Sequence, residues 1–207
     1  MTATTAPIHR LLRAVLTGLA AVAAVVLLAP AGAHAATASA GVVQPPPDCE
    51  GKCGGPPPPT AFIRFAASPG EANDVTWRGE GAAAAVIHDA GAPVVAGANC
   101  TALDEHTVRC ALVTPPVPPR ATVDLGDGGD RFRLGPGDGA PAVHGGDGDD
   151  VLSGADDAQP ANLDGGPGAD VVSDGPGASA LAGGPGPDTV TAGPGDDRIA
   201  DGDGDAD

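Results

Sequence analysis

The sequence predicts an all-β protein whose main part is a parallel β-roll of nonapeptide repeats. Glycine and proline supply 33 and 23 of the 207 residues and aromatic residues only 2%, so few large side chains are present to build an ordinary globular core. A motif of the form G-G-x-G-x-D-x-U-x, in which U is apolar, recurs in the second half of the chain. The apolar residues there follow one another at intervals of nine or eleven residues, and this spacing indicates a solenoid.

The clearest copies of the motif are GGDGDDVLS at residues 145–153, GGPGADVVS at 165–173 and GGPGPDTVT at 183–191. Looser copies start at Leu125, Asp174 and Ala192. This stretch resembles the RTX (hemolysin-type) calcium-binding repeat family, and specifically a small stand-alone member of the exported, actinobacterial type. The resemblance implies a right-handed β-roll in which calcium lies between stacked turns, held by aspartate side chains and by carbonyl oxygens of the glycine-rich turns.

The apolar ladder sets the register of the repeats. Its rungs are Val123, Phe132, Val143, Leu152, Leu163, Val172, Leu181, Val190 and Ile199. One coil of a roll takes two repeats, so repeats starting at 125, 145, 165 and 183 should stack on one side, called the first side. Repeats starting at 134, 154, 174 and 192 should stack on the second side, which also receives both eleven-residue repeats.

The two sides differ in their oxygen ligands. The sixth motif position is Asp130, Asp150, Asp170 and Asp188 on the first side, but Gly139, Gln159, Ser179 and Asp197 on the second. Calcium takes six to eight hard oxygens, so two stacked turns are needed to supply them. We expect about three calcium sites on the first side and at most one poor site near Asp197. The expected metal ligands come from Asp130, Gly145, Gly146, Gly148, Asp150, Gly165, Gly166, Gly168, Asp170, Gly183, Gly184, Gly186, Asp188 and Asp197.

Calcium should also decide whether the roll folds. Residues 124–207 hold 19 aspartates against Arg131, Arg133 and Arg198, a net charge of −16. These charges would repel one another in a compact roll, and one apolar rung per repeat is a thin core. We therefore expect this region to be largely disordered without calcium and to fold when calcium binds.

Residues 61–120 predict a small β cap in front of the roll, which we place at residues 121–207. Strand-like runs cover 61–65, 74–78, 85–88 and 107–110, with glycine-containing turns between them. We expect a disulfide between Cys100 and Cys110. This segment resembles the N-terminal part of exported actinobacterial-type RTX proteins, and its expected role is to cover the open strand edges of the solenoid.

The N-terminal 35 residues predict a cleaved secretory signal peptide. A basic start is followed by the apolar run 14–29 and by the cleavage motif Ala33-His34-Ala35, with a second candidate site at Ala38-Ser39-Ala40. A membrane anchor is the alternative, but the apolar run ends at Pro30 and is short for a span. Residues 36–60 are expected to form a disordered, proline-rich linker. Within it, Cys49 and Cys53 would be close enough to form a small disulfide loop in an exported chain.

The function predicted from these features is that of a secreted, extracellular calcium-binding protein with a non-catalytic structural or adhesive role. Neither H-E-x-x-H nor G-x-S-x-G occurs, and the acidic balance of −17 disfavours nucleic acid and anionic membranes as partners. We expect no membrane insertion, and we leave open which protein or cell surface is the partner. The alternatives are a calcium-dependent appendage or fragment of a secreted hydrolase or toxin, an acidic disordered spacer, or recognition of a surface such as ice or a cell wall.

Overall fold

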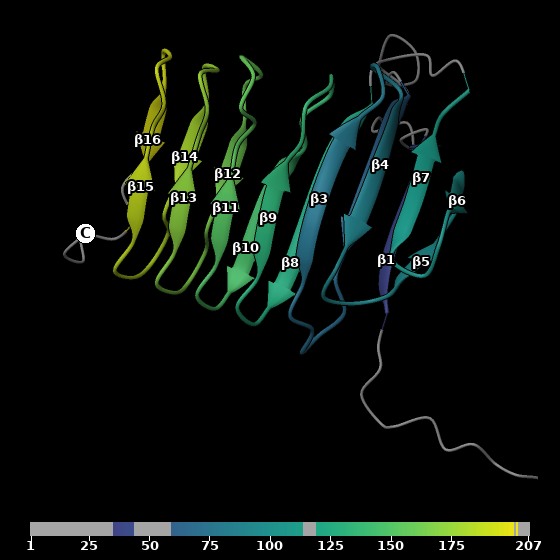
Figure 1. Ribbon diagram of the computed structural model, residues 1–207, viewed down its shortest axis with the longest axis horizontal. Coiled ribbons are helices and arrows are strands. Elements are labelled where there is room, and N and C mark those ends of the chain that lie inside the picture. Colours follow the sequence, from purple (N-terminus) through teal and green to yellow (C-terminus); the bar gives the residue numbers. More distant parts are fainter. Residues whose placement is uncertain (1–34, 44–58, 114–118, 201, 203–207) are drawn as a thin grey trace, which may run out of the picture. The chain divides into compact units, whose positions relative to one another are not determined.

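A computed structural model describes residues 35–43, 59–113, 119–200 and 202, all of which lie in one compact unit, Gly32–Asp207. Within these residues the chain is all-β, with two eight-stranded sheets and no helix (Figure 1). Accordingly, the described part of the chain contains no helix with the length and apolar character needed to cross a membrane.

The C-terminal half forms the parallel β-roll that the repeats predict. Its strands alternate between the two sheets, so that each coil contributes one strand to each sheet. The first sheet takes β8 (Arg120–Asp127), β10 (Ala142–Asp147), β12 (Asn162–Asp164), β14 (Ala180–Ala182) and β16 (Arg198–Ala200). The second takes β9 (Arg131–Leu134), β11 (Val151–Ser153), β13 (Val171–Ser173) and β15 (Thr189–Thr191). Successive coils stand side by side in chain order, from green to yellow in Figure 1.

The register predicted from the apolar ladder is confirmed. Val143 pairs with Leu163 in the first sheet, and Leu152 pairs with Phe132 and Val172 in the second. The rungs from Val123 to Leu181 are at most 2% exposed and form the core between the two sheets. Burial decreases at the last coil, where Ile199 is 54% exposed.

The cap continues both sheets of the roll. β2 (Thr60–Ala66) pairs in parallel with β8, and β3 (Asp74–Gly79) pairs in parallel with β9. The turn between β2 and β3 therefore stacks on the first turn of the roll like a further coil. Trp77, which is 1% exposed, packs in this junction and donates a hydrogen bond from Nε1 to the carbonyl oxygen of Gly139 at 3.2 Å.

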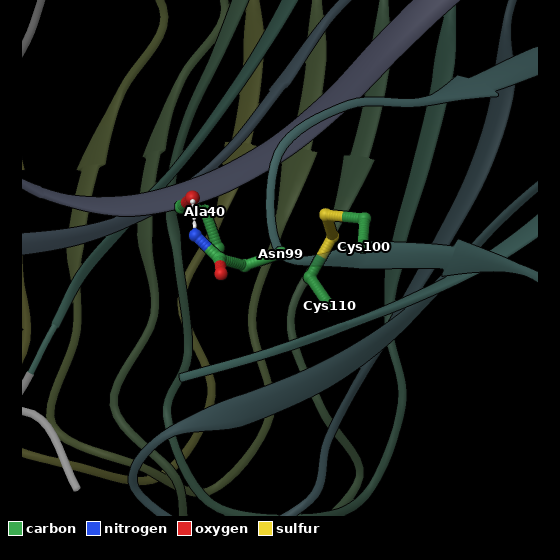
Figure 2. Close-up of a disulfide and its surroundings, with 4 residues drawn as sticks. All are labelled: Ala40, Asn99, Cys100 and Cys110. Carbon is green, nitrogen blue, oxygen red and sulfur yellow. Dashed lines mark hydrogen bonds between the residues drawn. A yellow bond between two sulfur atoms is a disulfide. The ribbon is translucent and has the colours of Figure 1, made fainter. Parts of the chain in front are cut away.

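Antiparallel strands complete the cap. β3 is followed in the second sheet by β4 (Ala84–Asp89), β7 (Thr107–Ala111) and β6 (Cys100–Ala102), while β5 (Val94–Ala96) lies at the end of the first sheet. Cys100 and Cys110 lie directly opposite each other on β6 and β7 and form the expected disulfide. Figure 2 shows the neighbouring Asn99, whose side chain donates a hydrogen bond of 2.8 Å to the carbonyl oxygen of Ala40.

The prediction of a disordered linker over residues 36–60 is wrong for its first eight residues. Residues 36–43 form a strand, β1 (Ala36–Val43), which pairs antiparallel with β2 and parallel with β5. Ala36, Ala38 and Ala40 are fully buried, because small side chains in alternation fit closely against the sheet core. The remaining linker residues with Cys49 and Cys53, and the predicted signal peptide up to residue 34, lie outside the described residues.

Candidate metal site

Four aspartates form a buried row along the first side of the roll. Asp130, Asp150 and Asp170 are 1% exposed and Asp188 is 6% exposed. In each pair, the backbone N–H of one aspartate donates to Oδ1 of the aspartate in the next coil. These hydrogen bonds measure 2.8 Å from Asp130 to Asp150, 2.8 Å from Asp150 to Asp170 and 2.9 Å from Asp170 to Asp188. These hydrogen bonds fix each accepting carboxylate in one orientation.

The second carboxylate oxygen has no such partner in the first three coils. Oδ2 of Asp130, Asp150 and Asp170 is buried and accepts no hydrogen bond. Leaving a buried polar atom unpaired is costly, by about 1–3 kcal/mol and more for a charged group. A row of such atoms in acidic side chains therefore points to a cation as the missing partner.

The first glycine of each clear repeat leaves a space beside this oxygen. A methyl group added to Gly145 would collide with Oδ2 of Asp150 and with the carbonyl oxygen of Gly165. At Gly165 the same methyl would meet Oδ2 of Asp170 and the carbonyl oxygen of Gly183. A carboxylate oxygen and a carbonyl oxygen from the next coil thus converge beside a Cα atom without a side chain. Both are hard oxygen ligands of the kind that calcium binds.

Other glycines of the motif are needed for the backbone. Gly146 and Gly148 have φ angles of 109° and 135°, a region that residues with a side chain rarely adopt. The first glycine of each clear repeat has no such φ angle, so the backbone conformation does not require a glycine there. What requires it is the space beside the carboxylate, which a side chain would fill. Since no three His, Cys, Asp or Glu side chains in the described residues are grouped to hold a metal, backbone carbonyls must supply part of the ligand set.

The first coil of the roll differs from those that follow. Gly126 pairs with Gly146, which places Leu125 where the next coil has Gly145. The Leu125 side chain is fully buried, whereas Gly145 and Gly165 have no side chain at the equivalent position. Asp130 is in the predicted row, but its coil lacks the glycine that opens the space. The leucine is visible in the sequence as a departure from the motif.

The electrostatics of the row favour a cation. Burial raises the pKa of Asp130 to about 7 and that of Asp150 to about 6, and it also raises the pKa of Asp170. Backbone N–H donors oppose this rise in pKa, while the aspartate of the next coil adds to it. A divalent cation beside Oδ2 would stabilise the charged carboxylates and displace their protons.

The second side has no comparable row. Ser179 accepts a hydrogen bond from the Ala161 N–H and donates its own N–H to Oδ1 of the half-buried Asp197. Sequence reasoning missed Asp174, which replaces a first glycine and directs its carboxylate to the space beside Gly154. Both oxygens of Asp174 are buried without a hydrogen-bond partner. The substitution of the glycine by an acidic residue was the available signal.

Stacked glycine-rich turns with a buried aspartate row define a calcium-binding β-roll. In agreement, residues 142–158, 164–199 and 182–205 match the family model of the RTX calcium-binding nonapeptide repeat, in four copies. The chain thus carries RTX calcium-binding nonapeptide repeats, as its sequence motif predicts. Comparisons with curated proteins and with solved structures gave no match.

Proposed function

We propose that this protein is exported, folds its repeats around calcium outside the cell, and acts without catalysis as a structural or adhesive module. The observation that carries the proposal is the pair of glycine-lined spaces at Gly145 and Gly165, each with a buried aspartate oxygen and a carbonyl oxygen directed into it. Protein interiors are close-packed, so side chains would normally fill spaces of this kind. We infer that these spaces are kept open for a bound ion.

We place two well-formed sites on the first side. One lies between the turns that begin at Gly145 and Gly165, and the other between the turns that begin at Gly165 and Gly183. The gap between the Asp130 and Asp150 turns, which the sequence also suggested, is disfavoured because Leu125 occupies the position of the first glycine. Each ion would bridge two coils and neutralise carboxylates that otherwise repel.

Calcium concentration would then control folding. Extracellular calcium modules commonly bind at about 10⁻⁴–10⁻³ M, a range that leaves a chain unliganded inside a cell and liganded outside. Residues 124–207 hold 19 aspartates and three arginines, so bound calcium would relieve the repulsion between their charges. The roll would therefore become stable outside the cell, where calcium is abundant.

The position of β1 bears on the proposed export. Cleavage after Ala35 would leave β1 whole, whereas cleavage after Ala40 would remove its three fully buried alanines. We therefore propose cleavage after Ala35. Mass spectrometry of the secreted protein should find Ala36 as its first residue, and a chain that begins at Gly41 would overturn this assignment.

Calcium binding to the row is tested by changing its two central carboxylates. In the double variant Asp150→Asn, Asp170→Asn, equilibrium dialysis should show two fewer bound calcium ions than in the wild type. Asp164→Asn is the control, since it removes one charge from a side chain that is 46% exposed. Unchanged stoichiometry in the double variant would refute the proposed sites.

A further inference from the structure

The proposed cleavage point lies inside a sheet, with strands on both of its sides. Ala36 is fully buried and pairs with Val94 of β5. On its other side β1 runs antiparallel to β2, and their register continued by two residues places Ala35 opposite Ser68. The Ser68 hydroxyl donates a hydrogen bond of 2.9 Å to the carbonyl oxygen of Ala35, which agrees with this placement. The peptide bond between residues 35 and 36 is thus held against the end of β2.

A buried carboxylate is bound to the same serine. Oε2 of Glu71 accepts a hydrogen bond of 2.9 Å from the backbone N–H of Ser68, and the Glu71 N–H donates to the Ser68 carbonyl oxygen at 3.3 Å. Glu71 is 9% exposed, and its Oε1 is buried without a hydrogen-bond partner. None of the ion pairs among the described residues includes Glu71. A buried carboxylate oxygen of this kind requires a donor or a cation.

Cleavage would create a cation at this point. Hydrolysis of the bond between residues 35 and 36 by a signal peptidase consumes one water molecule. The oxygen of the water enters the carboxylate of the departing peptide, and both hydrogens join the nitrogen of Ala36, which becomes an α-ammonium group. An α-amino group is mostly protonated at pH 7. It offers three N–H donors and no acceptor, and a charge left without a partner inside a sheet is costly.

We propose that the α-ammonium group of Ala36 pairs with Oε1 of Glu71 and with the Ser68 hydroxyl, and that this pairing holds β1 in the cap of the mature protein. The inference rests on the proposed cleavage after Ala35 and adds a binding site for the new N-terminus. Ser68 contacts both partners, since its hydroxyl binds the residue that is cut off and its N–H binds the carboxylate. Once Ala35 has left, the hydroxyl is free to accept from the ammonium.

The uncut chain lacks this pairing. There the nitrogen of Ala36 is a neutral amide, and Oε1 of Glu71 keeps its unpaired state. β1 is therefore held less firmly in the precursor than in the mature protein. Removal of the signal peptide would complete the cap after export.

A double-mutant cycle tests the pairing. Chains released from a fusion begin either at Ala36 or at Gly32, the first residue of the compact unit, and each is made with and without Glu71→Gln. The longer chain keeps the bond between residues 35 and 36 and moves the ammonium up to about 13 Å along the chain. Glutamine keeps the size of the side chain and an oxygen that accepts from the Ser68 N–H.

Urea unfolding in saturating calcium, followed by the fluorescence of Trp77, measures the stability of the cap, because Trp77 is the only tryptophan and lies on β3. In the chain from Ala36, Glu71→Gln should lower the equilibrium constant for folding at least about tenfold. In the chain from Gly32 the same change should leave this constant unchanged or raise it, because it removes a buried charge that has no partner there.

The reactivity of the α-amino group gives a second readout, which does not depend on unfolding. Lys52 is the only lysine, so acylation of Ala36 can be measured against it by mass spectrometry. Acylation should be at least about tenfold slower in the wild type than in Glu71→Gln, because a paired ammonium releases its proton less readily. Glu105→Gln is the matched control, since this exposed cap residue binds the N–H of Val94 through its backbone carbonyl only.

An equal loss of stability from Glu71→Gln in both chains would refute the pairing, because it would show that Glu71 only supports the turn at Ser68. An effect that appears with Glu105→Gln instead would refute it as well. If the secreted protein begins at Gly41 while the cycle shows the coupling, the proposed cleavage fails and the binding site for the ammonium stands. If the secreted protein begins at Ala36 and the cycle shows no coupling, the cleavage stands and the pairing is refuted.

Discussion

Replacing Gly165 by alanine should close one calcium site without removing any charge. Gly165 has no left-handed φ angle, so alanine can adopt its backbone conformation. The new methyl carbon would, however, lie 2.7 Å from Cγ of Asp170 and would collide with Oδ2 of the same carboxylate. It would also contact the carbonyl oxygen of Gly183 at 2.5 Å. Both oxygens are therefore displaced from the position they need to hold a common ion.

The magnitude follows from linkage between binding and folding. At a calcium concentration of 100 times Kd, one site stabilises the folded state by about 2.7 kcal/mol. At that calcium concentration, urea unfolding followed by circular dichroism should give Gly165→Ala a free energy of unfolding about 2.7 kcal/mol below that of the wild type. Dialysis should find one ion fewer.

Gly129→Ala is the control, because its methyl would meet only the carbonyl oxygen of Asp149, at 3.3 Å, and no carboxylate. If Gly165→Ala binds as many ions as the wild type and gains as much stability from calcium, the space beside Gly165 is not a calcium site.

Three further predictions follow from the described contacts. Because burial raises the pKa of Asp130 to about 7 and that of Asp150 to about 6, calcium affinity should rise between pH 5 and pH 7.5 as these carboxylates lose their protons. Dialysis at the two pH values measures it, and a pH-independent affinity would contradict the burial of the row. Cys100→Ser should lower cap stability by about 3 kcal/mol because its disulfide closes a short loop, and a thermal melt unchanged from the wild type would oppose this. Leu152→Ala should lower stability by about 2–5 kcal/mol, whereas Val171→Ala, 42% exposed, should have little effect; equal losses in urea would show that the ladder is not the core.

The roll could be predicted in detail because its sequence repeats its structure. One apolar rung per nonapeptide, such as Leu152 or Val172, is enough to set which strands pair and which turns stack. The buried aspartates were also predictable, since the sixth motif position falls in the same place in every first-side turn. Periodicity carries this information because each coil meets only its neighbours.

The cap was predictable only in outline. The runs that became β2, β3, β4 and β7 alternate large apolar and polar residues, and this pattern indicates strands. β1 was missed because alanine is depleted in strands and its burial depends on partners distant in sequence.

The difference between the first coil and the later ones could not be predicted from the sequence. Leu125 was recognisable as a departure from the motif, but its consequence depends on where its side chain lies relative to Asp130. Periodicity predicts which residues are equivalent, and it does not predict how much space remains between them. We therefore propose fewer sites on the first side than the count of stacked aspartates suggests.

Far-UV circular dichroism of the chain from Ala36 onward, titrated with calcium and then with a chelator, tests the central claim most directly. Magnesium serves as the control, since it binds open, flexible oxygen sites poorly compared with calcium. The account predicts a reversible transition from coil to β structure that calcium causes and magnesium does not. A β signal that persists unchanged in excess chelator would contradict the claim that calcium drives the folding of the roll.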